Sequence, residues 1–458
     1  MFPVFTTSWA LAILFHLSTP QGGGRSPTGL LLFGAATAVV FWPTCALSLL
    51  ALCALQIVQF WYRLPRAQSS EYFKFICGLC LLSTYARLSL AQSTLQVEPE
   101  AWLRSALPLL RLAVSLLFLA AVLHKLNQDF LRTGVSFAPP FFDRVLEVFG
   151  FSSPPWIQHS SSYATILIES FLGIGLLFPA TRLLAILVLL SFFFVVGLQG
   201  IAQFSSLMYA SALWFFDDKV LGSTASYLGS ASRSHLAFAV GCLLLFSSAL
   251  LLRRGSMLLV PAVSLFSAYV VFALTRALLA GGASAVVSTP SFPLSPGQVA
   301  LLLLFSLNEL GPYIGYKDWP SFRMYSNLRT GLSGNHLFLR AWIFVPFFRG
   351  RREVAITAAT KHLLYLDHGE TGEEFYVPYS SLAAIARYHL RHPTPDLGDS
   401  LRQIEYDHQD TREAEGLESF GRKGRSWLDF LLPARFFYHF PASRRAGRGS
   451  RAAGRCHS

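Results

Sequence analysis

The sequence has too little charge for a soluble protein of its length. Of its 458 residues, 14% are charged and 53% are hydrophobic, and the mean hydropathy is +0.46. Soluble globular domains carry about a quarter of their residues as Asp, Glu, Lys and Arg. The shortage excludes a cytosolic enzyme and a disordered scaffold. The composition is that of a membrane protein.

Cysteine is also scarce, and its placement does not favour redox chemistry. There are six cysteines, mostly inside apolar runs, and Cys77 and Cys80 are flanked by Phe75, Ile76 and Leu79. A C-x-x-C pair in a soluble redox fold indicates a reactive dithiol, but in this setting we interpret both thiols as small packing residues. The sequence predicts neither a disulfide framework nor a metal site.

The chain lacks two further features. Residues 1–19 have no positive charge before their apolar run and no small-residue cleavage site, unlike a cleaved secretory signal. We interpret this segment as a first membrane segment or an interfacial helix. No internal repeat is visible, which argues against a transporter built from two similar halves.

Long apolar runs recur through the first 316 positions. They predict a polytopic all-α membrane domain over 1–318 with about eight to ten transmembrane helices. The stretch 29–61 is too long for one untilted span and carries Pro43, and 180–216 is long enough for two helices broken near Gly197, Gly200 and Gln203. The candidate spans are 29–61, 72–95, 104–124, 159–178, 180–216, 235–252, 256–280 and 297–316.

Basic residues in the short loops favour one orientation. When 180–216 is counted as two helices, all basic groups fall on one side, which the positive-inside rule assigns to the cytoplasm. One miscounted span would reverse this assignment, but the loop after 104–124 and the C-terminal region are still expected to share a face. The basic groups are Arg63, Arg66 and Lys74; Lys125, Arg132 and Arg144; Arg253 and Arg254; and the region from Lys317 onward.

The last part of the chain has a different character. Residues 321–458 carry 20 of the 37 basic and 14 of the 25 acidic residues. Short alternating segments predict a small α+β extramembrane domain over 319–415, with strands from about 352 to 377 and a helix near 379–389. Residues 416–458 are basic and rich in Gly, Ser and Ala, which predicts a disordered tail drawn to anionic lipid rather than to nucleic acid.

The segment HKLNQDFL at the end of span 104–124 is the first candidate site. It places His124, Lys125, Asn127 and Asp129 within about two helical turns at the membrane boundary. A lysine amine held partly out of water can be neutral and act as a base, with the other three side chains in support. The same residues fit a structural role, in which Lys125 snorkels and the others cap the chain's exit, and physical chemistry alone favours that role.

Polar groups beyond the last span form a second candidate site. Asn327, Arg329, Asn335 and His336 follow one another within 322–339. Arg329 can clamp a carboxylate or phosphate while the amides fix its geometry. The alternative is an ordered linker, in which these side chains satisfy turns and backbone groups.

Two acidic residues lie within predicted spans. Glu169 and Glu309 are costly in a bilayer unless they are paired, and Arg104, Arg111 or Arg182 could supply the countercharge. The alternative for each carboxylate is a role in proton or substrate handling.

Two motifs give the chain a family resemblance. HKLNQDFL is similar to the lysine-containing motif of the vitamin K-dependent γ-carboxylase superfamily, especially of its bacterial relatives, the HTTM-domain proteins. FRMYSNLRTGLSGNHLFL at 322–339 resembles the segment that follows the last span in those proteins. Residues 169–216 are similar to the family's glutamate-led helix, P-x-T-R turn and F-S-containing helix. The likeness covers roughly 70–330, with a membrane core at about 70–316.

The resemblance implies that Lys125 is the base that activates reduced vitamin K or another quinone. It also implies a multi-pass protein of the bacterial inner (plasma) membrane. The family's histidine upstream of the lysine is missing from 72–95 and 101–123, and Gly197 stands at the place of a second one. Losing a donor that stabilises an anion costs about 2–4 kcal/mol in the transition state. The resemblance therefore does not extend to glutamate carboxylation.

Two functions remain open from the sequence. One is a membrane enzyme with carboxylase-like or quinol-oxygenase-like activity, using Lys125 as base on a quinone or another lipid-soluble substrate. The other is a non-catalytic membrane protein that binds a lipid or a protein partner. A catalytic Lys125 should point into an enclosed space with polar neighbours, whereas a structural one should point toward headgroups. The residues themselves predict no cofactor and no nucleic acid, only the lipid bilayer as partner.

Overall fold

In a computed structural model, the chain divides into two units. Unit 1 comprises Met1–Arg63, Ala67–Leu123 and Pro140–Asn308, and unit 2 comprises Leu64–Arg66, His124–Pro139 and Glu309–Ser458. The predicted spans 235–252 and 256–280, the helix near 379–389 and the tail 416–458 lie outside the described residues. The structure describes residues 2–19, 23–24, 26–63, 68–132, 136, 138–148, 150–197, 201–216, 294–311, 313, 336–338, 353–358, 375–378, 404–408 and 411–415.

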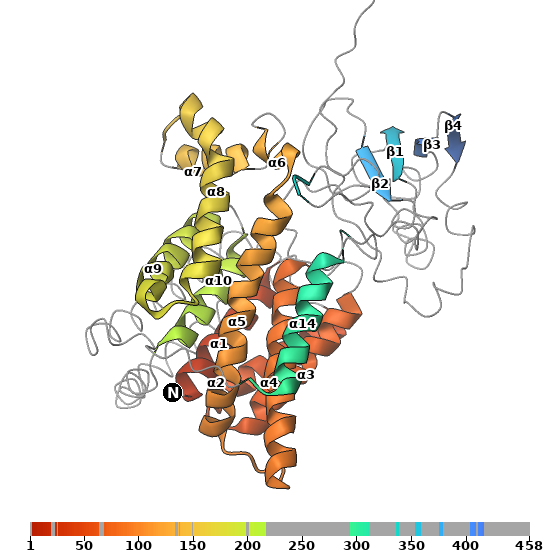
Figure 1. The fold of residues 1–458 in the computed structure, drawn as a ribbon. Coiled ribbons are helices and arrows are strands. Elements are labelled where there is room, and N and C mark those ends of the chain that lie inside the picture. Colours follow the sequence, from red (N-terminus) through yellow and green to blue (C-terminus); the bar gives the residue numbers. More distant parts are fainter. Residues whose placement is uncertain are drawn as a thin grey trace, which may run out of the picture. The chain divides into compact units, whose positions relative to one another are not determined.

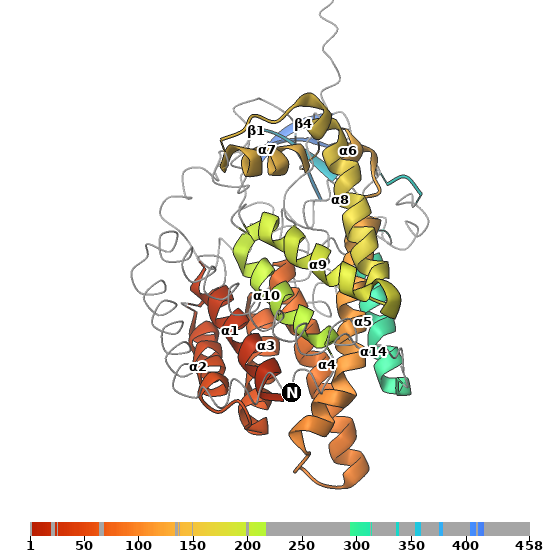
Figure 2. The ribbon, with the colours of Figure 1, turned by 90° about the vertical axis from the view of Figure 1, so that its left-hand side faces the viewer.

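Helices of unit 1 follow the apolar runs, and proline stands at the start of several of them. The long stretch 29–61 forms two helices with Pro43 between them, and α2 begins at a Ser26 cap followed by Pro27. These helices lie side by side in Figures 1 and 2. The first five helices are α1 (Phe2–Ser18), α2 (Pro27–Phe41), α3 (Ala46–Arg63), α4 (Ser69–Gln92) and α5 (Pro99–Lys125).

Two helices form over 180–216, as predicted, but Gly197 keeps a helical backbone as part of a π-helical turn, and Gly200 lies outside the described residues. Helix α9 (Pro179–Val196) ends at Gly197, and α10 (Ala202–Ala212) follows with a 3-10 turn, η2 (Leu213–Phe215). Gln203, however, lies inside α10 rather than at the break. The other described helices are α6 (Gln128–Leu131), α7 (Ala138–Val148), α8 (Pro155–Gly175) and α14 (Pro296–Leu310).

Helix α1 forms the centre of unit 1. Fifteen of its 17 residues are buried, so protein covers it on nearly all sides. This differs from the one-sided burial expected of an interfacial helix. Aromatic rings anchor it: the Trp9 and Trp214 ring centroids are 5.4 Å apart, and the Phe73 ring stacks on Trp214 at 6.2 Å.

Four described helices are long and apolar enough to cross a bilayer. They are α3, α4, α5 and α9, while α1, α2 and α14 are apolar but shorter. Together these helices indicate a membrane protein. Leu184, Leu187 and Phe194 of α9 are exposed, as expected of apolar side chains in contact with lipid.

Four short strands form one antiparallel sheet in unit 2. The strand order is β2-β1-β3-β4, and the pairing of β1 with β3 shifts register between Ile356 and Ala358. The strands are β1 (Glu353–Ala358), β2 (Phe375–Pro378), β3 (Ile404–His408) and β4 (Thr411–Glu415).

Candidate functional site

The first site is built at the end of α5, where the chain turns sharply. Asn127 has an extended backbone and caps α6, because its Oδ1 accepts from the Phe130 backbone N–H at 2.8 Å. Its Nδ2 donates to the His124 carbonyl at 2.9 Å. One buried amide therefore closes α5 and opens the next turn, which holds His124 and Lys125 in fixed positions.

His124 is the centre of a buried chain of hydrogen bonds. Its Nε2 lies 3.2 Å from Glu309 Oε2, and its Nδ1 lies 2.8 Å from Tyr313 Oη. An ionised carboxylate can only accept, so Nε2 carries a proton toward Glu309 and Nδ1 can accept from the tyrosine hydroxyl. His124 is fully buried, and Glu309 and Tyr313 are 3% and 6% exposed.

This chain of hydrogen bonds can transfer a proton without any displacement of heavy atoms. The tyrosine hydroxyl can pass its proton to Nδ1 while Nε2 passes one to the carboxylate. Acid and base forms are thus exchanged between Tyr313 and Glu309 through one imidazole. The arrangement is chemically suited to taking up or delivering a proton next to an apolar substrate.

The two motifs that were separated in sequence meet in unit 2. Asn127 and His336 pair as an antiparallel bridge, and the Leu337 backbone N–H donates to the Leu126 carbonyl at 2.9 Å. The His336 ring packs edge-on against Tyr313 with centroids 5.0 Å apart. His336 Nδ1 accepts from the Phe338 backbone N–H at 3.1 Å, so its proton is on Nε2.

Lys125, the next residue after His124, is also buried. The whole residue is 5% exposed, and its amine lies 5.9 Å from the centroid of the Phe130 ring. A snorkelling lysine would extend its amine into water or headgroups. The Lys125 amine instead lies near an aromatic ring inside the protein.

Other predicted site residues cannot be placed in this cluster. The Asp129 backbone belongs to α6, and its side chain, together with Asn327, Arg329 and Asn335, lies outside the described residues. Tyr313 was not predicted from the sequence. Its spacing of four from Glu309 is the one signal that could have indicated it.

For Glu309 the structure shows a histidine partner. The partner is His124, whereas Arg111 donates to the Trp214 carbonyl at 2.6 Å and Arg182 donates to the Leu176 carbonyl at 3.0 Å. Both arginines therefore satisfy backbone carbonyls, which long guanidinium side chains reach readily. Glu169 is buried in α8.

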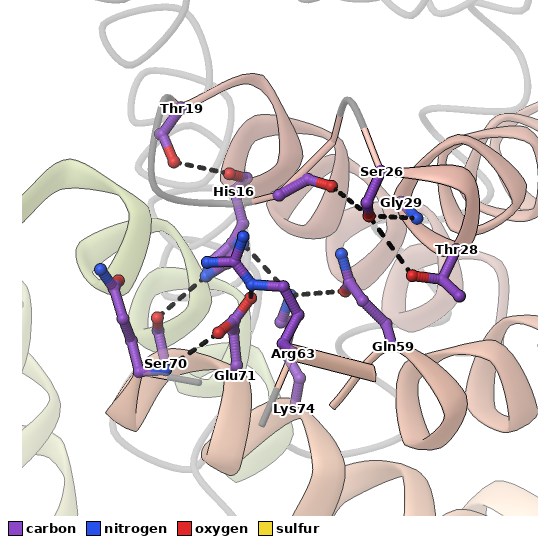
Figure 3. A network of polar contacts seen from close by, with 12 residues as sticks. His16, Thr19, Ser26, Thr28, Gly29, Gln59, Arg63, Ser70, Glu71 and Lys74 are labelled. Atoms are coloured by element: carbon purple, nitrogen blue, oxygen red, sulfur yellow. Dashed lines mark hydrogen bonds and ion pairs between the residues drawn. The ribbon is translucent and has the colours of Figure 1, made fainter. Parts of the chain in front are cut away.

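A second buried polar cluster lies in unit 1, and the sequence did not predict it (Figure 3). Lys74 Nζ is 3.1 Å from His16 Nδ1 and 3.4 Å from Gln59 Oε1, and His16 Nε2 is 2.9 Å from Ser70 Oγ. The expectation that Lys74 belongs to a basic loop is wrong. It lies within α4 and is 2% exposed.

Arg63 and Glu71 complete this cluster. Arg63 Nε lies 3.0 Å from Glu71 Oε1, and the other carboxylate oxygen accepts from the Gln68 backbone N–H at 2.9 Å. The Arg63 side chain is 19% exposed, whereas that of Glu71 is 2% exposed. The cluster thus reaches solvent through the guanidinium.

Cys77 and Cys80 are buried free thiols in α4, together with Cys53 in α3. Within the described part of the chain, no group of His, Cys, Asp and Glu is arranged to hold a metal ion. No family model, curated protein or solved structure matches the chain.

Proposed function

We propose that this chain is a multi-pass membrane enzyme of the HTTM and γ-carboxylase-like class, in which Lys125 takes a proton from a quinol or another lipid-soluble acid. The observation that carries the proposal is the burial of Lys125, which directly follows His124 in the chain, together with the buried hydrogen bonds that join His124 to Tyr313 and Glu309. Intramembrane ionisable groups are costly, and those gathered at one place favour a functional role over a structural one.

The chemistry of these side chains fits a hydroquinone. Its two hydroxyl groups need a base and hydrogen-bond partners, and Lys125, Tyr313 and His124 would provide them. A bound quinol would supply the redox chemistry. The chain's own residues would accept a proton at Lys125 Nζ and hold another between His124 Nε2 and Glu309 Oε2.

Two imidazoles of unit 2 could serve in place of the family histidines that this sequence lacks. His124 and His336 are both buried near Tyr313, with ring centroids 5.5 Å and 5.0 Å from its ring. They could stabilise an anion formed beside Lys125, although they come from other sequence positions. Glutamate carboxylation is not part of the proposal.

The proposal has a cellular and a domain component. The apolar helices would place the protein in a bacterial inner membrane, with the helix count of about eight to ten expected from the apolar runs. The four-stranded sheet of unit 2, with a helix near 379–389, would form the small α+β extramembrane domain over 319–415.

The test is oxygen-dependent oxidation of a reduced naphthoquinone by the full-length protein in detergent. Lys125→Met keeps the length and apolar stem of the side chain but removes the amine. It should lower turnover by about 10²–10⁴-fold, as expected for loss of a general base. Glu309→Gln should lower turnover less, because the amide can still accept from His124.

His159→Gln is the matched control, because His159 is an exposed residue of α8 that bonds the Pro155 carbonyl. It should leave turnover unchanged, and thermal melting should show that all three variants fold. Equal turnover in wild type and Lys125→Met would rule out Lys125 as the base. If wild type shows no turnover, the enzyme proposal fails, and the chain becomes a membrane protein that binds a lipid or a protein partner.

A further inference from the structure

The His16 and Lys74 pair in unit 1 brings two bases into direct contact. The two nitrogens are 3.1 Å apart, which is hydrogen-bond distance. In such a bond one nitrogen carries the hydrogen and the other provides a lone pair. The pair therefore cannot hold a full ammonium and a full imidazolium at once.

Its hydrogen bonds accommodate one proton in either place. When Lys74 is an ammonium, it donates to His16 Nδ1 and to Gln59 Oε1, and His16 Nε2–H donates to Ser70 Oγ. When Lys74 is a neutral amine, His16 is an imidazolium that donates from both ring nitrogens. The heavy atoms need not move between the two forms.

Charge in the cluster is set by a small number of groups. Glu71 is its carboxylate, and the contact with Arg63 at 3.0 Å neutralises that charge. A proton on the pair therefore leaves one net positive charge in a site that is at most 2% exposed at His16, Lys74 and Gln59. Burying an unmatched charge is unfavourable, while the two acceptors around the pair, Gln59 Oε1 and Ser70 Oγ, stabilise it.

Burial disfavours the charge and the acceptors stabilise it. We therefore expect the proton shared by His16 and Lys74 to exchange with solvent. Among the described residues, the charged and titratable groups that face the pair are Arg63 from α3 and Glu71 from α4, one helical turn before Lys74. Helices α2 and α10 also pack against α1, and neither carries an acidic or basic side chain. Arg63 offers the route to water, because its side chain is 19% exposed while that of Glu71 is 2% exposed.

We propose that His16 and Lys74 form a proton-binding site inside the helical unit, which holds one shared proton and exchanges it through the Arg63 and Glu71 end. The site is separate from the cluster around Lys125. Its ligand is the proton, and the geometry requires no larger cavity.

The experiment is nuclear magnetic resonance of the full-length protein in detergent, with ¹⁵N in lysine and histidine side chains. The chain has six lysines and 12 histidines, so the signals can be assigned by substitution. Across a pH titration, the Lys74 and His16 signals should change with one common midpoint, because both nuclei report the same proton.

His16→Gln keeps a polar side chain but removes the imidazole, and it should shift the Lys74 midpoint. His159→Gln, at an exposed position, is the matched control and should leave that midpoint unchanged. The proposal is overturned if Lys74 stays an ammonium throughout, if the two signals titrate at different pH values, or if His16→Gln leaves Lys74 unaffected. Should His16→Gln fail to fold, the common midpoint in the wild-type protein decides the question.

Discussion

His124 Nε2 and Glu309 Oε2 lie 3.2 Å apart although 185 residues separate them in the chain. Both side chains are almost completely buried, and the tyrosine at 313 occupies the other ring nitrogen of the histidine. The contact joins the end of α5 to the end of α14. One acid–base pair thus holds together two segments of unit 2 that are far apart in the sequence. Its stability and its chemistry can be tested separately.

His124→Phe should destabilise the protein more than the double variant His124→Phe with Glu309→Leu. The single change leaves a buried carboxylate without its imidazole, which costs about 3–5 kcal/mol, whereas the double change replaces the pair by apolar groups. The free energy of unfolding in mixed detergent and dodecyl sulfate micelles measures both. A double variant as unstable as the sum of the single changes would show that the pair is not coupled.

Asn127→Ala should cost about 1–2 kcal/mol of stability, because it removes the cap on Phe130 N–H and the bond to the His124 carbonyl. Asn127→Asp keeps the accepting oxygen and should cost less. Ser26→Ala, which removes the cap at Gly29 N–H of α2, provides a matched comparison. The same unfolding measurement applies, and an Asn127→Ala variant as stable as wild type would contradict the capping role.

The positions of helix ends could be predicted from the sequence because proline and glycine act locally. Pro43 separates α2 from α3, and Gly197 follows the last residue of α9. A proline removes a backbone donor and a glycine weakens the helix, which favours an end at these positions, although α5 continues through Pro108. Such signals need no knowledge of tertiary structure.

Partners in the buried clusters could not be predicted in the same way. The sequence suggested that Lys74 belongs to a basic loop. Only the packing of α1 against its neighbours brings Lys74 into contact with His16, 58 residues earlier in the chain. Glu309 was expected to pair with an arginine, and nothing in the sequence indicated its contact with His124, 185 residues earlier. Which polar groups meet depends on how the helices pack, and a single sequence does not report that.

The candidate site was predicted in part. Lys125 and His336 were singled out on their motifs, and the structure places the two segments side by side through the bridge between Asn127 and His336. Their chemical roles stay predictions. Tyr313 carried no motif, because a tyrosine just after an apolar helix is ordinary in sequence.

Gly78→Ala should destabilise the packing of α3 against α4. A Cβ at this position would lie 3.1 Å from the Cys53 carbonyl oxygen and 3.2 Å from the end of the Gln56 side chain. The backbone carbonyl cannot turn away, so the helices would have to separate, and overpacking of this kind costs about 1–3 kcal/mol. Small residues commonly allow such close approach between membrane helices.

Gly34→Ala is the control for this prediction, because a Cβ there would meet no atom within 4 Å. Alanine in α2 should be neutral or stabilising by about 0.5–1 kcal/mol, since glycine weakens a helix interior. Thermal melting of both variants in detergent compares them directly. A Gly78→Ala variant that melts with Gly34→Ala would show that α3 and α4 are not in close contact at this point.

Gly197→Ala should be tolerated, which separates the backbone role of this glycine from the chemistry of the histidine expected there by resemblance. Gly197 has right-handed helical angles, φ −63° and ψ −40°, so it needs no glycine-specific conformation. A Cβ would lie 3.4 Å from Ser205 Oγ, an ordinary contact. We expect an unchanged melting temperature and unchanged quinol oxidation. A loss of stability would mean that α9 and α10 must flex at Gly197, and the break would then be a hinge that alanine stiffens.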